Sequence, residues 1–241
     1  EVVMIKLFRK IRKNLLSEGK TGKYLKYAIG EIILVVIGIL IALSINNWND
    51  IRKNRNYERE ILFLINQNLK NDSIALSNEL RRSKTSIKLT DKLLEQVSLG
   101  NYSDSLNHWM GRIISFEIFK SQSSAFEILK SKGIDVISDK ELQLELITYY
   151  DESISNAYEA IEDVEESFKE DWAPRLQEEF LDYKWREYAS LNNPKAFFER
   201  QSNISLFKLY KENRASGLPY LEAALEKVSK IRKLSKKQIN D

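Results

Sequence analysis

The chain is organised around one apolar stretch, Tyr24-Leu-Lys-Tyr-Ala-Ile-Gly-Glu-Ile-Ile-Leu-Val-Val-Ile-Gly-Ile-Leu-Ile-Ala-Leu-Ser-Ile-Asn-Asn-Trp48. Between Ile32 and Ile45 this stretch contains no charged residue. Together with the residues before Ile32 it gives about 19 residues, roughly what a helix needs to cross the ~30 Å hydrocarbon core of a bilayer. We therefore predict a single transmembrane helix over residues 27–48.

The flanks of this stretch predict its orientation. Lys and Arg are frequent in residues 6–26, whereas fewer follow the stretch, in residues 52–59. Since Lys and Arg are enriched on the cytoplasmic side of a span, we expect the N-terminus in the cytoplasm and residues 49–241 in the periplasm. The aromatic residues that we expect to anchor the helix at headgroup level are Tyr24, Tyr27 and Trp48.

Residues 1–26 alternate apolar and cationic side chains at helical spacing, which predicts a basic amphipathic segment on the cytoplasmic membrane surface. Two alternatives remain open. The segment resembles the basic part of a signal sequence, and Ala42-Leu-Ser44 resembles the small residues of a signal-peptide cleavage site.

Two features inside the span suggest functions. Gly30, Gly38 and Ala42 lie near one helix face, and small residues there let two membrane helices approach closely, although Gly and Ala are also common in such helices. Glu31 is an intramembrane acid. Its place in the first turns favours an interfacial anchor or assembly contact over a proton-carrying role.

The composition predicts an all-α fold. Gly (8) and Pro (3) are scarce, while 43% of the residues are hydrophobic and 30% are charged. A row of residues at every seventh position from Leu62 to Val97 is apolar except at Ser83 and Thr90, which predicts a long bundle helix. We expect one transmembrane helix followed by an antiparallel bundle of about four long helices with short helices between them.

Further helices are expected in the body, over residues 105–120, 121–133, 138–172 and 203–234, with a short helix after Asn192. Gly217 and Pro219 are expected to kink or split the last of the long helices.

The sequence carries no catalytic, metal or cofactor motif, so we expect no enzyme activity and no cofactor. It has no Cys, and its single His, His108, cannot form a zinc site without partners. The acidic run 159–171 is typical of a solvated helix face. The net charge is only +3, and Lys and Arg residues are interspersed with Asp and Glu, which argues against nucleic acid as a partner.

One aromatic cluster is the strongest candidate for a pocket or partner surface in the body, although it is more typical of core beneath a loop. Pro174 is expected to interrupt the helix here, and an aromatic-rich connector to follow. The cluster comprises Trp172, Phe180, Tyr183, Trp185 and Tyr188.

Two blocks of the sequence carry a resemblance to a known family. The first runs from Phe8 to Lys20 and from Lys26 to Asn49, and the second, looser block runs from Ser124 to Ile134 and on through Ile137-Ser-Asp to Tyr149-Tyr150. Both blocks resemble an uncharacterised family of single-span membrane proteins of Bacteroidota. The resemblance implies an inner-membrane protein of a Gram-negative bacterium with its body in the periplasm. The family has no established activity that could be transferred.

Asp72-Ser73-Ile74 and Asp104-Ser105-Leu106 resemble the short O-glycosylation sequence of exported Bacteroidota proteins. The function that we expect is a membrane-anchored, non-enzymatic interaction, scaffold or accessory protein. Its expected partners are the lipid bilayer and either further copies of the chain or another membrane protein. The alternative is a periplasmic ligand sensor or transport accessory subunit, and only this alternative involves a small-molecule ligand.

Overall fold

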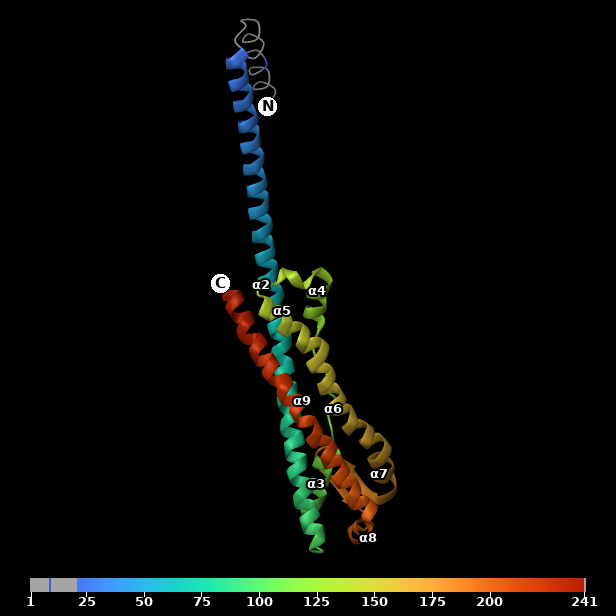
Figure 1. Ribbon diagram of the computed structural model, residues 1–241. Helices are drawn as coiled ribbons and strands as arrows, with labels where there is room; N and C mark the ends of the chain where they lie inside the picture. The colour runs from blue at the N-terminus through green and yellow to red at the C-terminus, as the bar shows by residue number, and fades with distance from the viewer. Residues whose placement is uncertain (1–8, 10–20, 241) are drawn as a thin grey trace. The chain divides into compact units, whose positions relative to one another are not determined.

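A computed structural model describes Arg9 and residues 21–240 (Figure 1). The chain divides into two compact units, Glu1–Asn56 and Tyr57–Asp241. Most of the predicted basic segment, residues 1–26, lies outside the described residues.

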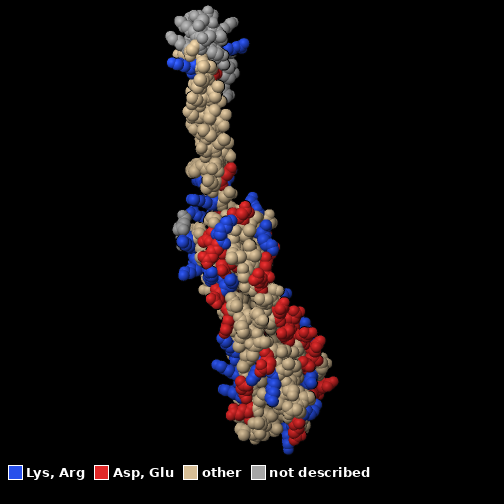
Figure 2. All heavy atoms as spheres, viewed as in Figure 1, with Lys and Arg blue, Asp and Glu red and all other residues tan. Residues whose placement is uncertain are grey.

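Helix α2 (Thr21–Ser98) contains both the apolar stretch and the first helix of the body. No Gly or Pro follows the stretch until Gly100, so nothing in the sequence breaks the helix. From Leu25 this helix is long and apolar enough to cross a membrane, by length and composition. In the first unit, the side chains from Ile32 to Ile45 are exposed, and Figure 2 shows this part as a band of uncharged atoms.

The second unit confirms the all-α prediction, with one small hairpin added. After α2, the helices and helical turns follow in this order: α3 (Ser105–Ile114), α4 (Ser124–Lys132), η1 (Ile134–Val136), α5 (Lys140–Ile147), η2 (Thr148–Ser153), α6 (Ile154–Ser167), η3 (Phe168–Trp172), α7 (Ala173–Glu179), α8 (Pro194–Glu199) and α9 (Gln201–Asn240). The two strands, β1 (Phe180–Lys184) and β2 (Tyr188–Leu191), lie between α7 and α8. The segments from α5 to α7 follow one another without a break, and η2 and η3 are π-helical turns within them.

Helix α9 packs along α5 and α6 and runs through Pro219 without being split (Figure 1). Proline removes one backbone donor from the helix, but the apolar residues that follow hold α9 in place, since Leu221, Ala224 and Val228 are buried. A Cβ at Gly217 would lie 3.0 Å from the Cβ of Ala160. The glycine therefore lets α9 approach α6 closely.

Two apolar cores form along α2. The first joins α2 between Ile61 and Leu76 to α4, α5, α6 and the C-terminal half of α9. The second joins α2 near Leu93 to α3, the hairpin, α8 and the N-terminal half of α9. The predicted seven-residue row on α2 is thus divided between two cores.

Three expectations about local structure were wrong. Pro174 does not interrupt the helical run, which continues to Glu179, because the proline lies in the first turn of α7 directly after the π-helical turn η3. The helix predicted over residues 105–120 ends at Ile114, because Ser115 is extended and the final carbonyl groups bind side chains of other helices. The aromatic connector after Pro174 is instead an antiparallel hairpin with Tyr183 opposite Ala189 and a register shift between Phe180 and Asp182. The hairpin is stabilised because residues along β2 are alternately buried, and the buried face of this strand packs into the second core.

The hairpin packs directly against the backbone of α3. A Cβ on Gly111 would overlap the backbone N, Cα and C atoms of Tyr188. Glycine is therefore required at this position by the close approach of two backbones, and it fixes how α3 and β2 meet.

We predict that Gly111→Ala destabilises the protein by about 1–3 kcal/mol. Alanine would favour the helix by about 1 kcal/mol, but the clash with a backbone that cannot rotate away outweighs this gain. Thermal unfolding of the full chain in detergent, followed by circular dichroism, measures the change. Asn107→Ala on the same helix is the control and is expected to have little effect; equal stability of Gly111→Ala and the native chain would contradict the packing described.

Candidate functional site

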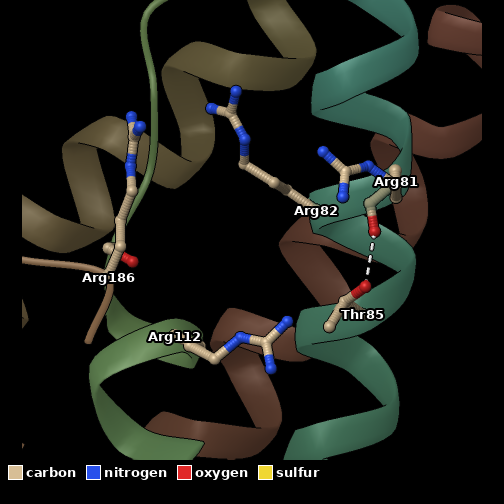
Figure 3. Close-up of a pocket in the computed structure, with 6 residues that line it drawn as sticks. Arg81, Arg82, Thr85, Arg112 and Arg186 are labelled. Carbon is tan, nitrogen blue, oxygen red and sulfur yellow. Dashed lines mark hydrogen bonds between the residues drawn. The ribbon is translucent and has the colours of Figure 1, made fainter. Parts of the chain in front are cut away.

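The clearest candidate site is a pocket lined by arginines in the second unit (Figure 3). Its volume is about 160 Å³, whereas one water needs only about 10–15 Å³ of such space, so a small ligand fits. The lining residues are Arg81, Arg82 and Thr85 of α2, Arg112 of α3, Ser115, and Arg186 of the hairpin turn. We call this the arginine pocket.

The fold brings these arginines together from three elements. Arg81 and Arg82 are neighbours on α2, and Arg112 lies in the last turn of α3 directly after Gly111. Arg186 has a positive φ of 66° in the turn between β1 and β2. Non-glycine residues adopt this conformation infrequently, and such strain is concentrated at functional sites.

Glu117 is the carboxylate closest to the pocket's charges. It forms an ion pair with Arg82, and its Oε2 lies 3.1 Å from Nη2 of Arg186. One carboxylate is therefore shared by two guanidinium groups. Within the described part of the chain, neither Arg81 nor Arg112 forms an ion pair.

A second carboxylate, Glu79, lies deeper. Its side chain is 6% exposed, with Oε2 3.6 Å from Arg82 and Oε1 3.7 Å from Arg214. Burial lowers the pKa of the Arg82 guanidinium; Glu79 opposes this shift, while Arg186 and other arginines add to it. Burial and the neighbouring arginines thus both disfavour the charged form of Arg82.

Arg214 of α9 closes the inner side of this region. Its side chain is 1% exposed, and Nη2 donates to the carbonyl groups of Ile113 (3.3 Å) and Ser115 (2.7 Å). The hydroxyl of Tyr210, also on α9, donates to the carbonyl of Ile114 at 2.9 Å. The C-terminal carbonyl groups of α3 are thus bound by α9, which holds Arg112 at the pocket.

A larger hollow of about 460 Å³ adjoins the arginine pocket and shares Arg82 with it. It lies between α2 and residues 117–120, and Glu79 and Glu117 also line it. Arg82 and its two carboxylates thus stand between the two spaces.

The aromatic cluster predicted as a pocket surface divides into core and hairpin residues. Trp172 and Phe180 are buried in the second core. Tyr183 and Tyr188 are half-buried, and the more exposed Trp185 packs its ring edge-on against Phe116 and Phe168. The five residues line neither the arginine pocket nor its adjoining hollow.

The other chemically reactive side chains lie apart from the pocket. His108 is exposed, its Nδ1 lies 3.2 Å from the carbonyl of Glu187, and most of the acidic run 159–171 faces solvent. Among the described residues, no group of three or more His, Asp and Glu side chains could hold a metal ion.

The residues singled out in the span lie in the first unit. A Cβ on Gly30 or Gly38 would meet no atom within 4 Å, and Ala42 is exposed, so their face is open for packing. Glu31 is half-exposed. Tyr27 and Trp48 are exposed at the two ends, with Arg52 above the Trp48 ring; the side chain of Tyr24 lies outside the described residues.

The buried carboxylate of Asp72 is the centre of a hydrogen-bond network. It accepts from the hydroxyl groups of Ser121 (2.5 Å) and Tyr149 (2.8 Å) and from the backbone N–H of Gln122 (2.9 Å). The network ties the connector after α3 to α2.

Asp72 is also the first residue of the predicted glycosylation sequence Asp72-Ser73-Ile74. Glycosylation at Ser73 would therefore have to act on a sequence whose Asp is 2% exposed. Ser105, in the second such sequence, is exposed, so that site stays a prediction.

The sequence does not predict the arginine pocket because its residues come from distant positions in the chain. The adjacent pair Arg81-Arg82 on a helix was its only local signal, and adjacent arginines are common on solvated helices. Arg112 and Arg186 join them only through the contact between α3 and the hairpin.

Fold and site together define an all-α protein with one long apolar helix, suited by length and composition to crossing a membrane, and a helical body with an arginine-lined pocket. Residues 31–115 match a family described as a family of unknown function (DUF6090). The match begins in the apolar stretch and ends at Ser115, so it includes the pocket residues of α2 and α3 but not Arg186. No curated protein and no solved structure matches the chain.

We predict that Asp72→Ala costs about 3 kcal/mol of stability, since it leaves the buried hydroxyl of Tyr149 and two partly buried donors, at Ser121 and Gln122, without their acceptor. Tyr149→Phe removes one hydrogen bond and should cost about 1 kcal/mol. Denaturant unfolding of the full chain in detergent, followed by tryptophan fluorescence, gives both values. Tyr150→Phe is the matched control, because its hydroxyl lies 3.5 Å from its acceptor; equal costs for both tyrosine variants would contradict the assigned network.

A second prediction concerns alkaline pH. Burial raises the pKa of Tyr210 to about 12, with Arg214 opposing the shift, while an unfolded tyrosine ionises near pH 10. The neutral phenol therefore contributes stability below about pH 10 that is lost as the pH rises toward 12. The melting temperature should fall over this range, and less steeply in Tyr210→Phe than in the control Tyr220→Phe, which removes an exposed tyrosine of the same helix. Identical slopes would refute this assignment.

Proposed function

We propose that the protein is a membrane-anchored, non-enzymatic interaction or accessory protein that assembles with copies of itself or with another membrane protein. The apolar stretch would hold it in the inner membrane of a Gram-negative bacterium. The N-terminus would face the cytoplasm and the body the periplasm, as the excess of Lys and Arg before the stretch favours.

The observation that carries this proposal is the exposed apolar surface of α2. Its large hydrophobic side chains from Leu25 to Ile45 are about half or more exposed. In water so continuous an apolar surface would aggregate, and a bilayer or a second helix removes that cost.

A face for assembly can be named on this helix. Glu31 and Gly38 are seven residues apart, or about two turns, and Ala42 follows one turn later. Small residues allow close backbone contact, and an acid on the same face can hydrogen-bond across the contact. The proposed assembly uses this face.

The chemistry of the body supports a non-enzymatic role. Glycoside hydrolysis generally needs two carboxylates that converge on an open cleft. Glu79 and Glu117 are the carboxylates near the described pockets, and both are held by arginines.

The arginine pocket favours a second candidate function, a ligand sensor or transport accessory subunit. This function requires a ligand site in the body, and the pocket would supply one for an anion. Binding there would be read out through the connector that carries Glu117.

Crosslinking in native membranes, followed by mass spectrometry, tests the assembly. We expect crosslinked species from the native chain, reduced at least about threefold in Gly38→Leu and Glu31→Gln. Val36→Leu is the control, because it lies on the opposite face, about 160° from Gly38 at 3.6 residues per turn.

Membrane insertion of each variant is checked by alkaline extraction. Recovery of uncrosslinked chain alone from native membranes would refute the assembly. If Glu31→Gln impairs insertion but leaves crosslinking unchanged, Glu31 is a topological anchor and the proposed face loses its acid.

A further inference from the structure

The arginine pocket holds more positive charge than its surroundings neutralise. Arg82 and Arg186 share Glu117, while Glu79 is divided between Arg82 and the buried Arg214. Arg81 and Arg112 also line the pocket and add two further charges that are not in ion pairs within the described residues.

The arginines are positioned by the backbone. Arg112 follows Gly111, whose contact with Tyr188 fixes the end of α3, and Arg186 occupies a strained turn of the hairpin. In Figure 3, Arg81, Arg82, Arg112 and Arg186 stand around a common space on three separate chain segments. Arg81, Arg112 and Arg186 are exposed and Arg82 is half-buried, so a ligand can reach the pocket from solvent.

The geometry suits one class of anion. A guanidinium group presents a planar fork of donors that fits carboxylate and phosphate oxygens. A carboxylate is planar and carries one charge, and a pair of arginines can satisfy it, as Glu117 demonstrates. Arginines that approach from α2, α3 and the hairpin suit a tetrahedral group with more oxygens and about two charges.

We propose that the arginine pocket binds the phosphate group of a small anionic molecule, which displaces Glu117 from Arg82 and Arg186. The inference deepens the second candidate function and is independent of the proposed assembly. It makes Glu117 an internal competitor: its carboxylate occupies the arginines until the phosphate oxygens replace it. Freeing Glu117 would remove one of the contacts of the connector between α3 and α4, which Asp72 and Arg214 would still hold.

Calorimetric titration of the full chain in neutral detergent with inorganic phosphate, at constant ionic strength, tests the proposal. We expect binding at one site per chain, weakened about tenfold or more in Arg112→Gln and in Arg186→Asn. Asparagine tolerates the positive φ, so the turn survives. Arg59→Gln removes an exposed arginine outside the pocket and should bind as the native chain does.

Glu117→Gln tests the competition. It keeps the size of the side chain and removes its charge, so phosphate should bind about tenfold more tightly. A phosphate-binding chain in which this variant binds no more tightly would refute the displacement of Glu117. Absence of phosphate binding to the native chain, or equal weakening by Arg59→Gln and Arg112→Gln, would overturn the site.

A titration with acetate in place of phosphate distinguishes phosphate recognition from the second candidate function, which requires only that the pocket binds an anion. Acetate binding as tight as phosphate binding would overturn the phosphate class and leave the pocket as an anion site for the second candidate function. The source of the phosphate group is identified by titration in nanodiscs. If the pocket binds lipid headgroups, added phosphatidylglycerol weakens the binding of inorganic phosphate. If the ligand is soluble, the lipid leaves the affinity for inorganic phosphate unchanged. Both outcomes support phosphate recognition.

Discussion

The arrangement of the body depends on how the buried guanidinium of Arg214 is satisfied. Taking a charge out of water costs several kcal/mol unless it is paired and hydrogen-bonded. Arg214 is paired with Glu79, and its Nη2 donates to the carbonyl groups of Ile113 and Ser115, while its Nε has no hydrogen-bond partner among the described residues. These carbonyls end α3, where the helix dipole favours a cation. Through these contacts one side chain of α9 holds both the end of α3 and the start of the connector after it.

This buried charge explains why α2 changes character halfway along the body. Ser83, Ser86 and Thr90 are buried where the two apolar cores meet, and each hydroxyl has a partner. Ser86, for example, donates to the carbonyl of Ile113 at 3.3 Å. Apolar residues here would leave that region's polar groups without donors. The polar layer between the cores leads outward to the arginine pocket, so the site lies where apolar packing is interrupted.

The sequence was informative wherever a local pattern determined the outcome. Apolar residues without a break from Ile32 to Ile45 predicted the exposed helix, and scarce Gly and Pro predicted the all-α body. The hairpin was missed because an aromatic-rich segment without glycine carries no turn signal, and Arg186 instead adopts the positive φ that glycine would favour. The arginine pocket could not be predicted, since Arg82 and Arg186 meet only through tertiary packing.

Glu117 shows why the pocket is best understood as a competition. Without Glu117, the four arginines of the pocket would lie near one another, and Glu79 would be the only carboxylate paired with any of them among the described residues. Like charges in one hollow destabilise the fold, so an internal carboxylate stabilises the unliganded chain. A ligand must therefore bind more favourably than Glu117 does, and a group with more oxygens and more charge meets that condition. Because Glu117 lies on the connector that Arg214 also holds, the pocket's charge balance is coupled to the buried interaction that fixes the end of α3.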